Sequence, residues 1–278
     1  MQIGCHISVS KGLLNAAEKA NSLGANTFQV FTKNPRSLKP KKLDLEEALK
    51  ARQYCKEQGI SVVTHTPYIT NLSTPKADLQ EVSIRSLVED LQIAEEYGAI
   101  GAIVHCGKHV EQGEEYGIKR MVETLDLILE QYHGPAKLLL ENTAGQGTET
   151  GIFPETLVKI RSLTRYPEKI AFCFDTCHAF AAGIWDEASF EQFIKRAEDC
   201  GYLPLIKVIH LNDSKAPFGS NKNRHEKIGQ GEIGEKGLQK FLQSEHFQNT
   251  PFILETPVEQ EEDYQDEISY LKKLLQRS

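Results

Sequence analysis

The sequence contains no long apolar run. No stretch approaches the ~20 consecutive apolar residues that a membrane-spanning helix requires, so we expect no association with a membrane. The first residues, Met1–Gly4, include neither the basic segment nor the apolar segment of a secretion signal. We therefore expect a cytoplasmic protein.

The sequence also lacks closely spaced cysteines. Its six cysteines are scattered without a CxxC pair, and several lie in apolar segments that are predicted to be strands. Cys173 and Cys177 flank Asp175, but their spacing is not the usual spacing of a structural zinc site. This distribution excludes a disulfide framework and indicates reduced thiols that serve mainly as small apolar side chains.

Basic residues are outnumbered by acidic ones. The chain has 32 lysines and arginines against 39 aspartates and glutamates, which gives a formal net charge of −7. This balance disfavours a protein that binds nucleic acid non-specifically through an extended basic surface. It does not exclude an enzyme with a local positive site, because net charge says little about one face of a fold.

Short apolar runs alternate with helical patterns eight times along the chain. The predicted strands cover residues 2–7, 27–31, 61–65, 101–105, 137–141, 170–175, 206–211 and 251–255. The predicted helices cover residues 12–23, 44–58, 76–97, 114–132, 153–163, 187–200, 235–244 and 263–276. Eight such units predict a (β/α)8 TIM barrel whose active site lies at the C-terminal face of the strands. No linker or repeat interrupts the pattern, so we expect one domain over residues 1–278.

The alternative fold is an open doubly wound sheet. That fold binds dinucleotides through a GxGxxG motif after its first strand. No such motif follows the first predicted strand of this chain. The barrel is therefore the favoured architecture.

Seven of the apolar runs end on, or just before, a residue that can bind a metal. These residues are His6, His65, His105, Glu141, Asp175, His210 and Glu255. Buried charged groups are costly unless they are paired or bind a metal. Imidazole and carboxylate together suit zinc, manganese or iron better than calcium. Because six of these groups exceed the three or four ligands of one catalytic zinc, two metals that share a carboxylate are predicted, an arrangement typical of phosphoryl transfer.

The histidines outside the predicted strands divide into two sets. His178 and His225 lie in predicted loops at the same face, where either could hold another ion, and oxygen donors lie nearby at Asp213, Asn221 and Asn223. We expect His6, the weakest candidate in the strands, to pack beside the ligands instead of binding a metal. No partner pattern surrounds three further histidines, which we expect at the surface: His109, His133 and His246.

Three longer motifs point to one family. They are the segments Leu140–Gly147 (LENTAGQG), Phe174–Gly183 (FDTCHAFAAG) and His210–Lys215 (HLNDSK). With them the chain resembles the endonuclease IV family of apurinic/apyrimidinic (AP) endonucleases, which are zinc-dependent, and the similarity runs from Gly4–Ser8 to Ile253–Thr256. The resemblance implies a barrel with three zinc ions and a role in DNA repair. Its members cleave duplex DNA 5′ to an abasic site and leave a 3′-hydroxyl.

The resemblance also implies a role for each matching residue. His65, His105 and Glu141 would hold one zinc, and Glu141 would bridge to a second zinc that is also held by Asp175, His210 and Glu255. The third zinc would be held by His178 and His225, with Asn223 at the matching third position. The acidic ligands Glu141, Asp175 and Glu255 are the expected catalytic residues. Manganese or iron could replace zinc at ligands of this type.

Contacts with DNA are expected from loops at the same face. The resemblance implies that Arg36 and Tyr68 enter the duplex at the lesion. The basic residues of these loops would contact phosphates: Lys33, Lys39, Lys41, Lys42, Lys215, Lys222, Arg224 and Lys227. We expect Trp185 to pack under a loop. The expected partner is duplex DNA with an abasic site, and a barrel of this kind could act as a monomer.

The chain departs from the family pattern at three places. Asn223 stands where the family has aspartate, so we expect the third ion to bind more weakly or to exchange faster. Cys106 follows His105 where the family has proline, and we expect it to be a spectator. Ser37 and Leu38 replace polar and aromatic residues after Arg36, so the filling of the lesion gap could differ.

Two other functions are compatible with parts of this pattern. A metal-dependent sugar isomerase or epimerase needs only four such ligands, here Glu141, Asp175, His210 and Glu255. It needs neither the surplus histidines nor a basic loop after the second strand, so this surplus favours the nuclease. An inactive relative would have lost a ligand, and only position 223 is altered.

Overall fold

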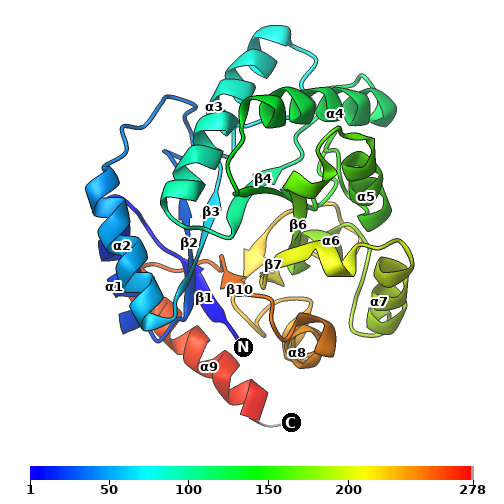
Figure 1. Ribbon diagram of the computed structural model, residues 1–278. Coiled ribbons are helices and arrows are strands. Elements are labelled where there is room, and N and C mark those ends of the chain that lie inside the picture. Colours follow the sequence, from blue (N-terminus) through cyan, green and yellow to red (C-terminus); the bar gives the residue numbers. More distant parts are fainter. Residues whose placement is uncertain (277–278) are drawn as a thin grey trace.

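Eight parallel strands close into a barrel in the computed structural model, which describes residues 1–276 (Figure 1). Around the barrel the strands follow the order β1, β10, β7, β6, β5, β4, β3, β2. Their bounds are β1 Ile3–His6, β2 Thr27–Phe31, β3 Ser61–His65, β4 Gly101–His105, β5 Lys137–Glu141, β6 Ile170–Asp175, β7 Ile206–His210 and β10 Phe252–Leu254. The predicted TIM barrel is confirmed, and each strand lies where the apolar runs predict it.

Helices surround the barrel (Figure 1). Their bounds are α1 Leu13–Ser22, α2 Leu45–Gln58, α3 Ala77–Glu96, α4 Glu114–Gln131, α5 Pro154–Leu163, α6 Thr176–Ala181, α7 Phe190–Asp199, α8 Gly234–Gln243 and α9 Tyr264–Gln276. Local sequence explains their ends: α2 begins after Asp44, whose carboxylate accepts the backbone N–H of Glu47, and ends at Gly59 with φ of 65°. None of the helices within residues 1–276 is long and apolar enough to cross a membrane.

Two apolar layers make up the core. The larger one fills the space between the strands and the helices, and the smaller one fills the inside of the barrel. The inner layer consists of Val63, Ile103, Leu139, Ala171, Cys173, Val208 and Ile253. Side chains along a strand alternate between its two faces, so the residue two positions after an inward-facing one also faces inward. For six of the strands that residue is a predicted metal ligand: His65, His105, Glu141, Asp175, His210 or Glu255.

The long loops contain secondary structure that the apolar patterns did not predict. Helix α6 follows β6 directly, in a segment that was expected to be a loop. The loop after β7 contains a small antiparallel pair, β8 (Asp213–Ser214) and β9 (His225–Glu226). Short 3-10 helices occur at η1 Pro167–Lys169, η2 Leu203–Leu205, η3 Glu245–Phe247 and η4 Glu261–Asp263. Helix α6 and the β8–β9 pair carry His178 and His225 to the mouth of the barrel.

Helix α6 rests on a buried tryptophan. Trp185 is fully buried, and its indole Nε1 donates a hydrogen bond to the carbonyl oxygen of Thr176 at 3.1 Å. The tryptophan is thus buried as predicted, but it packs under a helix and not under a loop. Its ring lies against Phe241, with centroids 4.6 Å apart, so it connects the start of α6 to α8.

Candidate metal centre

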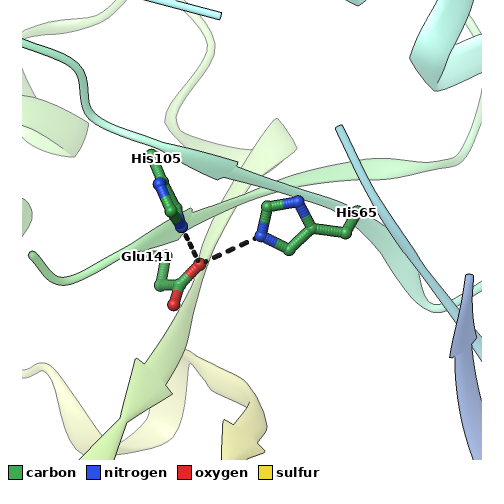
Figure 2. A group of neighbouring side chains, drawn as sticks. All are labelled: His65, His105 and Glu141. Carbon is green, nitrogen blue, oxygen red and sulfur yellow. Dashed lines mark hydrogen bonds and ion pairs between the residues drawn. The ribbon is translucent and has the colours of Figure 1, made fainter. Parts of the chain in front are cut away.

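The first group of ligands comes from three neighbouring strands. One carboxylate oxygen of Glu141, Oε2, lies 3.3 Å from Nε2 of His65 and 3.0 Å from Nε2 of His105. Figure 2 shows both imidazole rings directed at this oxygen. Nδ1 of His65 lies 2.7 Å from the carbonyl oxygen of Thr66, to which it donates, so Nε2 keeps its lone pair for a ligand. All three donor atoms could bind the same cation.

The second group shares Glu141 with the first. Its other oxygen, Oε1, lies 3.2 Å from Nδ1 of His210, which is also 3.3 Å from Oε2 of Glu255. The carboxylate of Asp175 completes the group, with Oδ2 at 3.8 Å from the same nitrogen. Because Glu141 turns one oxygen towards each group, it is placed to bridge two cations.

Two further histidines each have a ring nitrogen that makes no hydrogen bond within the described residues. Nδ1 of His178 donates to the carbonyl oxygen of Asn142 at 2.9 Å, and Nδ1 of His225 donates to that of Glu255 at 3.1 Å. Within the described residues, Nε2 of both rings is buried and has no hydrogen-bond partner. A buried polar atom without a partner is costly. Nε2 of His225 lies 3.6 Å from Oδ2 of Asp175, beyond hydrogen-bond distance, so both nitrogens are placed to bind a cation.

The surroundings of this third position include a thiol that was not among the expected ligands. Asp175, Cys177 and His225 offer donor atoms close enough together for one ion, and the role of His178, which lies outside this set, stays a prediction. Burial raises the pKa of the Cys177 thiol to about 12, and its Sγ donates to the carbonyl oxygen of Arg224 at 3.6 Å, which makes it a poor ligand beside the imidazoles. Asn223 is partly exposed beside this position, and its role as a ligand stays a prediction.

Asp213 does not serve as a nearby oxygen donor, contrary to the expectation from sequence. Its carboxylate is fully buried and accepts the backbone N–H groups of Ser214 at 2.7 Å, Gly231 at 3.0 Å and Ile233 at 3.0 Å. The N–H of Gly234 also approaches it at 3.3 Å. Asp213 thus holds the end of the loop after β7, and both of its oxygens are occupied by backbone N–H groups.

Three amide side chains that the sequence analysis did not single out fix the ligands. Gln29, on β2, donates from Nε2 to Oε1 of Glu255 at 2.7 Å and accepts from Nε2 of His210 at 2.8 Å. Asn142 pairs its amide with the backbone of Asp175, at 2.8 and 3.1 Å. The only sequence signal for Gln29 is a polar residue in the middle of a buried strand.

Asn212 joins the same network from the end of β7. Its Nδ2 donates to Oδ2 of Asp175 at 2.8 Å, and its Oδ1 accepts the backbone N–H of Glu255 at 2.8 Å. It therefore couples the carboxylate of Asp175 to the backbone of Glu255 on another strand. Such outer partners orient ligands and tune their affinity for a metal.

The charges of the cluster are strongly coupled. Burial favours a neutral acid at Glu141, but the neighbouring His105 and His210 hold its pKa well below the usual range. Burial acts in the same direction on Glu255, and His210 nevertheless holds its pKa at about 2. Burial also opposes a charge on His178, yet the carboxylates of Asp175 and Glu141 raise its pKa to about 10. Three buried carboxylates thus demand positive charge, which either protons or divalent cations can supply.

His6 lies beside the ligands and not among them, as expected. Its Nδ1 is 3.1 Å from Nε2 of Gln29 and 4.0 Å from Oε1 of Glu255. Burial lowers the pKa of His6 to about 4, so the ring is neutral at physiological pH. His133 and His246 are exposed, as predicted, whereas His109 is partly buried and accepts the N–H of Gly113 at 3.1 Å. Cys106 is buried beside the centre, and its Sγ donates to the carbonyl oxygen of Glu141 at 3.4 Å.

Two loops bring the residues expected at a DNA lesion next to this centre. Tyr68 is 52% exposed, and its ring lies 5.5 Å from that of His65 and 5.8 Å from that of His105. Its backbone N–H donates to the carbonyl oxygen of Pro35 at 3.0 Å, which joins it to the loop of the exposed Arg36. Lys215 and Arg224 are also exposed. Their contacts with DNA stay predictions.

The prediction that Lys33 contacts a phosphate is wrong. Its side chain is only 1% exposed, and its ammonium group lies 2.9 Å from Oε2 of Glu89 and 3.1 Å from Oδ1 of Asp90. Lys41 also turns inward, because its ammonium group donates to the hydroxyl of Tyr97 at 3.0 Å. The composition of a basic loop does not show which of its lysine side chains are exposed and which are buried against a neighbouring helix.

The chain is similar to known proteins over nearly its whole length. Residues 17–274 match the family described as xylose isomerase-like TIM barrel. A protein named probable endonuclease 4 from Symbiobacterium thermophilum is 53% identical over 276 residues, which are 99% of this chain and 100% of that protein. The crystal structure of endonuclease IV from Thermus thermophilus superposes with a TM-score of 0.87 at 33% identity, with 100% of both chains covered.

A more distant likeness concerns the fold alone. The crystal structure of a D-tagatose 3-epimerase-like protein matches with a TM-score of 0.70 at 18% identity, over 100% of this chain and 99% of that one. At this identity the match shows a shared barrel and does not favour epimerase chemistry.

Proposed function

This chain belongs to the endonuclease IV family within the xylose isomerase-like TIM barrels, and from that premise we infer that it is a metal-dependent DNA-repair endonuclease. It hydrolyses the phosphodiester bond 5′ to an abasic site in duplex DNA and leaves a 3′-hydroxyl. The observation that carries this function is the surplus of imidazoles, since His65, His105, His178 and His225 converge beyond the four ligands that an isomerase needs.

The ligand set fits three divalent cations, which we propose to be zinc. His65, His105 and Glu141 would hold the first, and Glu141 would bridge to a second held by Asp175, His210 and Glu255. The third would be held by His178 and His225 through the buried Nε2 atoms, which make no hydrogen bond within the described residues. When bound, such ions lower the pKa of a water molecule towards ~7 and neutralise charge on a phosphate.

The protein residues supply position and charge for the reaction. Gln29 and Asn212 hold the carboxylates of Glu255 and Asp175, and Asn142 holds the backbone of Asp175, so these two ligands need little reorganisation when substrate binds. Tyr68 stands over the imidazoles of the first group, where it would fill the space left by the missing base. Arg36 would contact the lesion from the adjoining loop, and Lys215 and Arg224 would contact flanking phosphates. An abasic nucleotide is cheap to extrude, because it has no base to unstack.

The third cation is expected to be the most weakly held. Asp175, whose carboxylate lies near this position, is shared with the second group, and Asn223 offers an amide oxygen without a formal charge. Asn223→Asp should therefore raise the number of ions retained per chain after dialysis against a chelator, whereas Asn223→Ser should not. Metal analysis of the three proteins tests this. Equal retention in all of them would show that position 223 does not bind the ion.

The nuclease assignment is tested with duplex DNA that carries one abasic analogue resistant to β-elimination. We expect a single nick 5′ to the analogue, loss of activity after prolonged chelation, and recovery on addition of zinc. Glu141→Gln should lose both ions of the first two groups and the activity. If the fully metal-loaded protein fails to nick this duplex, the assignment is wrong and epimerase assays with ketoses become the next step.

We also propose a domain organisation, an oligomeric state and a location in the cell. The chain forms one domain over residues 1–278, because the strands close one barrel around one inner core. It acts as a monomer, since every residue of the centre comes from one chain. It works in the cytoplasm, where the reducing conditions suit six cysteines that are all free.

A further inference from the structure

The buried ammonium group of Lys33 is fully occupied by helix α3. Lys33 lies two residues after β2, and its Nζ donates to the carbonyl oxygen of Ser86 at 2.9 Å and to Oγ of Ser86 at 2.8 Å. It also contacts Oε2 of Glu89 at 2.9 Å and Oδ1 of Asp90 at 3.1 Å. Residues three and four positions apart lie on one face of a helix. One face of α3 thus supplies all of the partners.

The same two acidic residues hold the loop at both of its ends. At the start of the loop, Oδ1 of Asp90 accepts the hydroxyl of Thr32 at 2.6 Å. Further along, Oε1 of Glu89 accepts the backbone N–H of Lys41 at 2.8 Å. Asp90 is fully buried, so neither water nor another side chain can readily replace these contacts. The loop is fastened by charged groups at residues 32–33 and again at residue 41.

Between the two fastened ends lies the turn that presents Arg36. The backbone N–H of Arg36 donates to Oδ1 of Asn34 at 2.9 Å, and that of Ser37 donates to the carbonyl oxygen of Asn34 at 3.0 Å. The adjacent Pro35 accepts the N–H of Tyr68 at 3.0 Å. The buried network therefore determines where Arg36 stands, and it also supports Tyr68 above the metal centre.

Stability alone does not account for a charged network at this place. Burial raises the pKa of Asp90 to about 6 in spite of Lys33 and Thr32, so ionisation of this carboxyl is unfavourable compared with water. Buried ion pairs can often be replaced by apolar residues without loss of stability. Directional contacts, in contrast, fix one conformation of a loop, which apolar packing does less well.

We propose that Lys33 is a positioning residue, which through Glu89 and Asp90 holds the Arg36 turn in the conformation that meets the DNA lesion. The proposal rests on the proposed function for the role of Arg36. It does not make Lys33 a contact to DNA, since its ammonium group is buried.

Two variants separate positioning from stability. Lys33→Met removes one charge and leaves Asp90 buried without its partner, so it should lower the melting temperature. Lys33→Met with Asp90→Leu removes the two fully buried charges, leaves the partly exposed Glu89, and should regain much of the melting temperature. Lys50→Met is the matched control, because Lys50 lies on α2 with a side chain that is 62% exposed, in an ion pair with Glu46.

The first measurement does not depend on activity. Trypsin cleavage after the exposed Arg36 is followed by mass spectrometry at a temperature at which all variants are folded. We expect cleavage at least tenfold faster in the single and the double variant than in the wild-type chain and in Lys50→Met. Cleavage at the wild-type rate in both variants would overturn the proposal.

The second measurement uses the abasic duplex. We expect KM to rise at least tenfold in both variants, with kcat changed less than threefold and the metal content unchanged. If the double variant regains both the melting temperature and the wild-type KM, the role of Lys33 is merely structural. If the wild-type chain does not cut this duplex at all, the proposed function fails, and the trypsin experiment still decides whether Lys33 holds the turn.

Discussion

Gln29 provides the sharpest test of how the metal ligands are held. Its side chain is fully buried between the side chains of Glu255, His210 and His6. Its Nε2 donates to Oε1 of Glu255 and lies 3.1 Å from Nδ1 of His6, and its Oε1 accepts from Nε2 of His210. The last contact fixes the tautomer of His210 and directs its Nδ1 at the carboxylates. Gln29→Leu removes all three contacts with little change in volume.

The expected magnitude follows from these contacts. Loss of an outer partner of a metal ligand lowers metal affinity typically about 10–100-fold. The metal-free protein should also lose about 2 kcal/mol or more of unfolding free energy, because a hydrogen bond to a carboxylate is lost and the N–H of His210 is left without an acceptor. The second group, with His210 and Glu255, should be affected before the first.

The assay is competition with a chromophoric chelator, performed on metal-free protein that is titrated with zinc. Gln53→Leu is the matched control, because Gln53 is exposed on α2 and donates to Glu57, at 2.6 Å, which is not part of the centre. We expect one of the ions to bind at least tenfold more weakly in Gln29→Leu and all to bind normally in Gln53→Leu. Affinities within twofold of the wild-type values would refute the argument that Gln29 orients the ligands.

Of four further predictions, two address the effect of pH, one the loop after β7 and one the DNA contact. Because the pKa of His178 is raised to about 10 in the metal-free chain, zinc must displace a proton, and chelator competition should show about tenfold weaker binding per pH unit between pH 8 and 6. For the same reason the contribution of His178 to metal-free stability is complete below its ordinary pKa of 6.5 and lost as the pH approaches 10, which urea unfolding at several pH values checks. Asp213→Ala leaves several buried N–H groups without their acceptor and should cost about 3 kcal/mol or more, measured by the same method, and a loss below 1 kcal/mol would contradict it. Tyr68→Ala should raise KM for the abasic duplex at least tenfold with unchanged metal content, and an unchanged KM would remove Tyr68 from the DNA surface.

The barrel and most of its ligands could be predicted because both depend on local patterns. A strand that is buried on both faces appears in the sequence as a short apolar run, and a charged residue at its end is unusual enough to stand out. Side chains alternate along a strand, so a residue two positions after an inward-facing one also faces inward. Leu139 lies inside the barrel, and Glu141 therefore points into its mouth. The grouping of ligands follows from the order of strands, which the right-handed crossovers determine.

The rest could not be predicted because it depends on contacts between distant segments. Lys33 follows a strand in a basic loop, and nothing in that loop indicates that Asp90 is buried 57 residues later, ready to receive it. Helix α6 was missed because it is short and its residues are buried all round, which leaves no amphipathic pattern. Asp213 appeared as a free oxygen donor, since its partners are backbone N–H groups that sequence does not distinguish.

The apolar floor of the barrel explains why an acidic chain can attract a phosphate. Beneath the centre, side chains such as Val63, Ile103 and Leu139 exclude water from the inside of the barrel. The carboxylates of Glu141 and Asp175 are fully buried. Their negative charge must therefore be balanced from the open side of the barrel, by imidazoles, amides and bound cations. The formal net charge of −7 includes these carboxylates as negative charges. Bound cations would neutralise them, so they would add no negative charge to the surface that DNA meets. The sign of the charge that DNA meets is thus determined by the centre and its exposed basic loops, and the total charge of the chain is a poor guide to it.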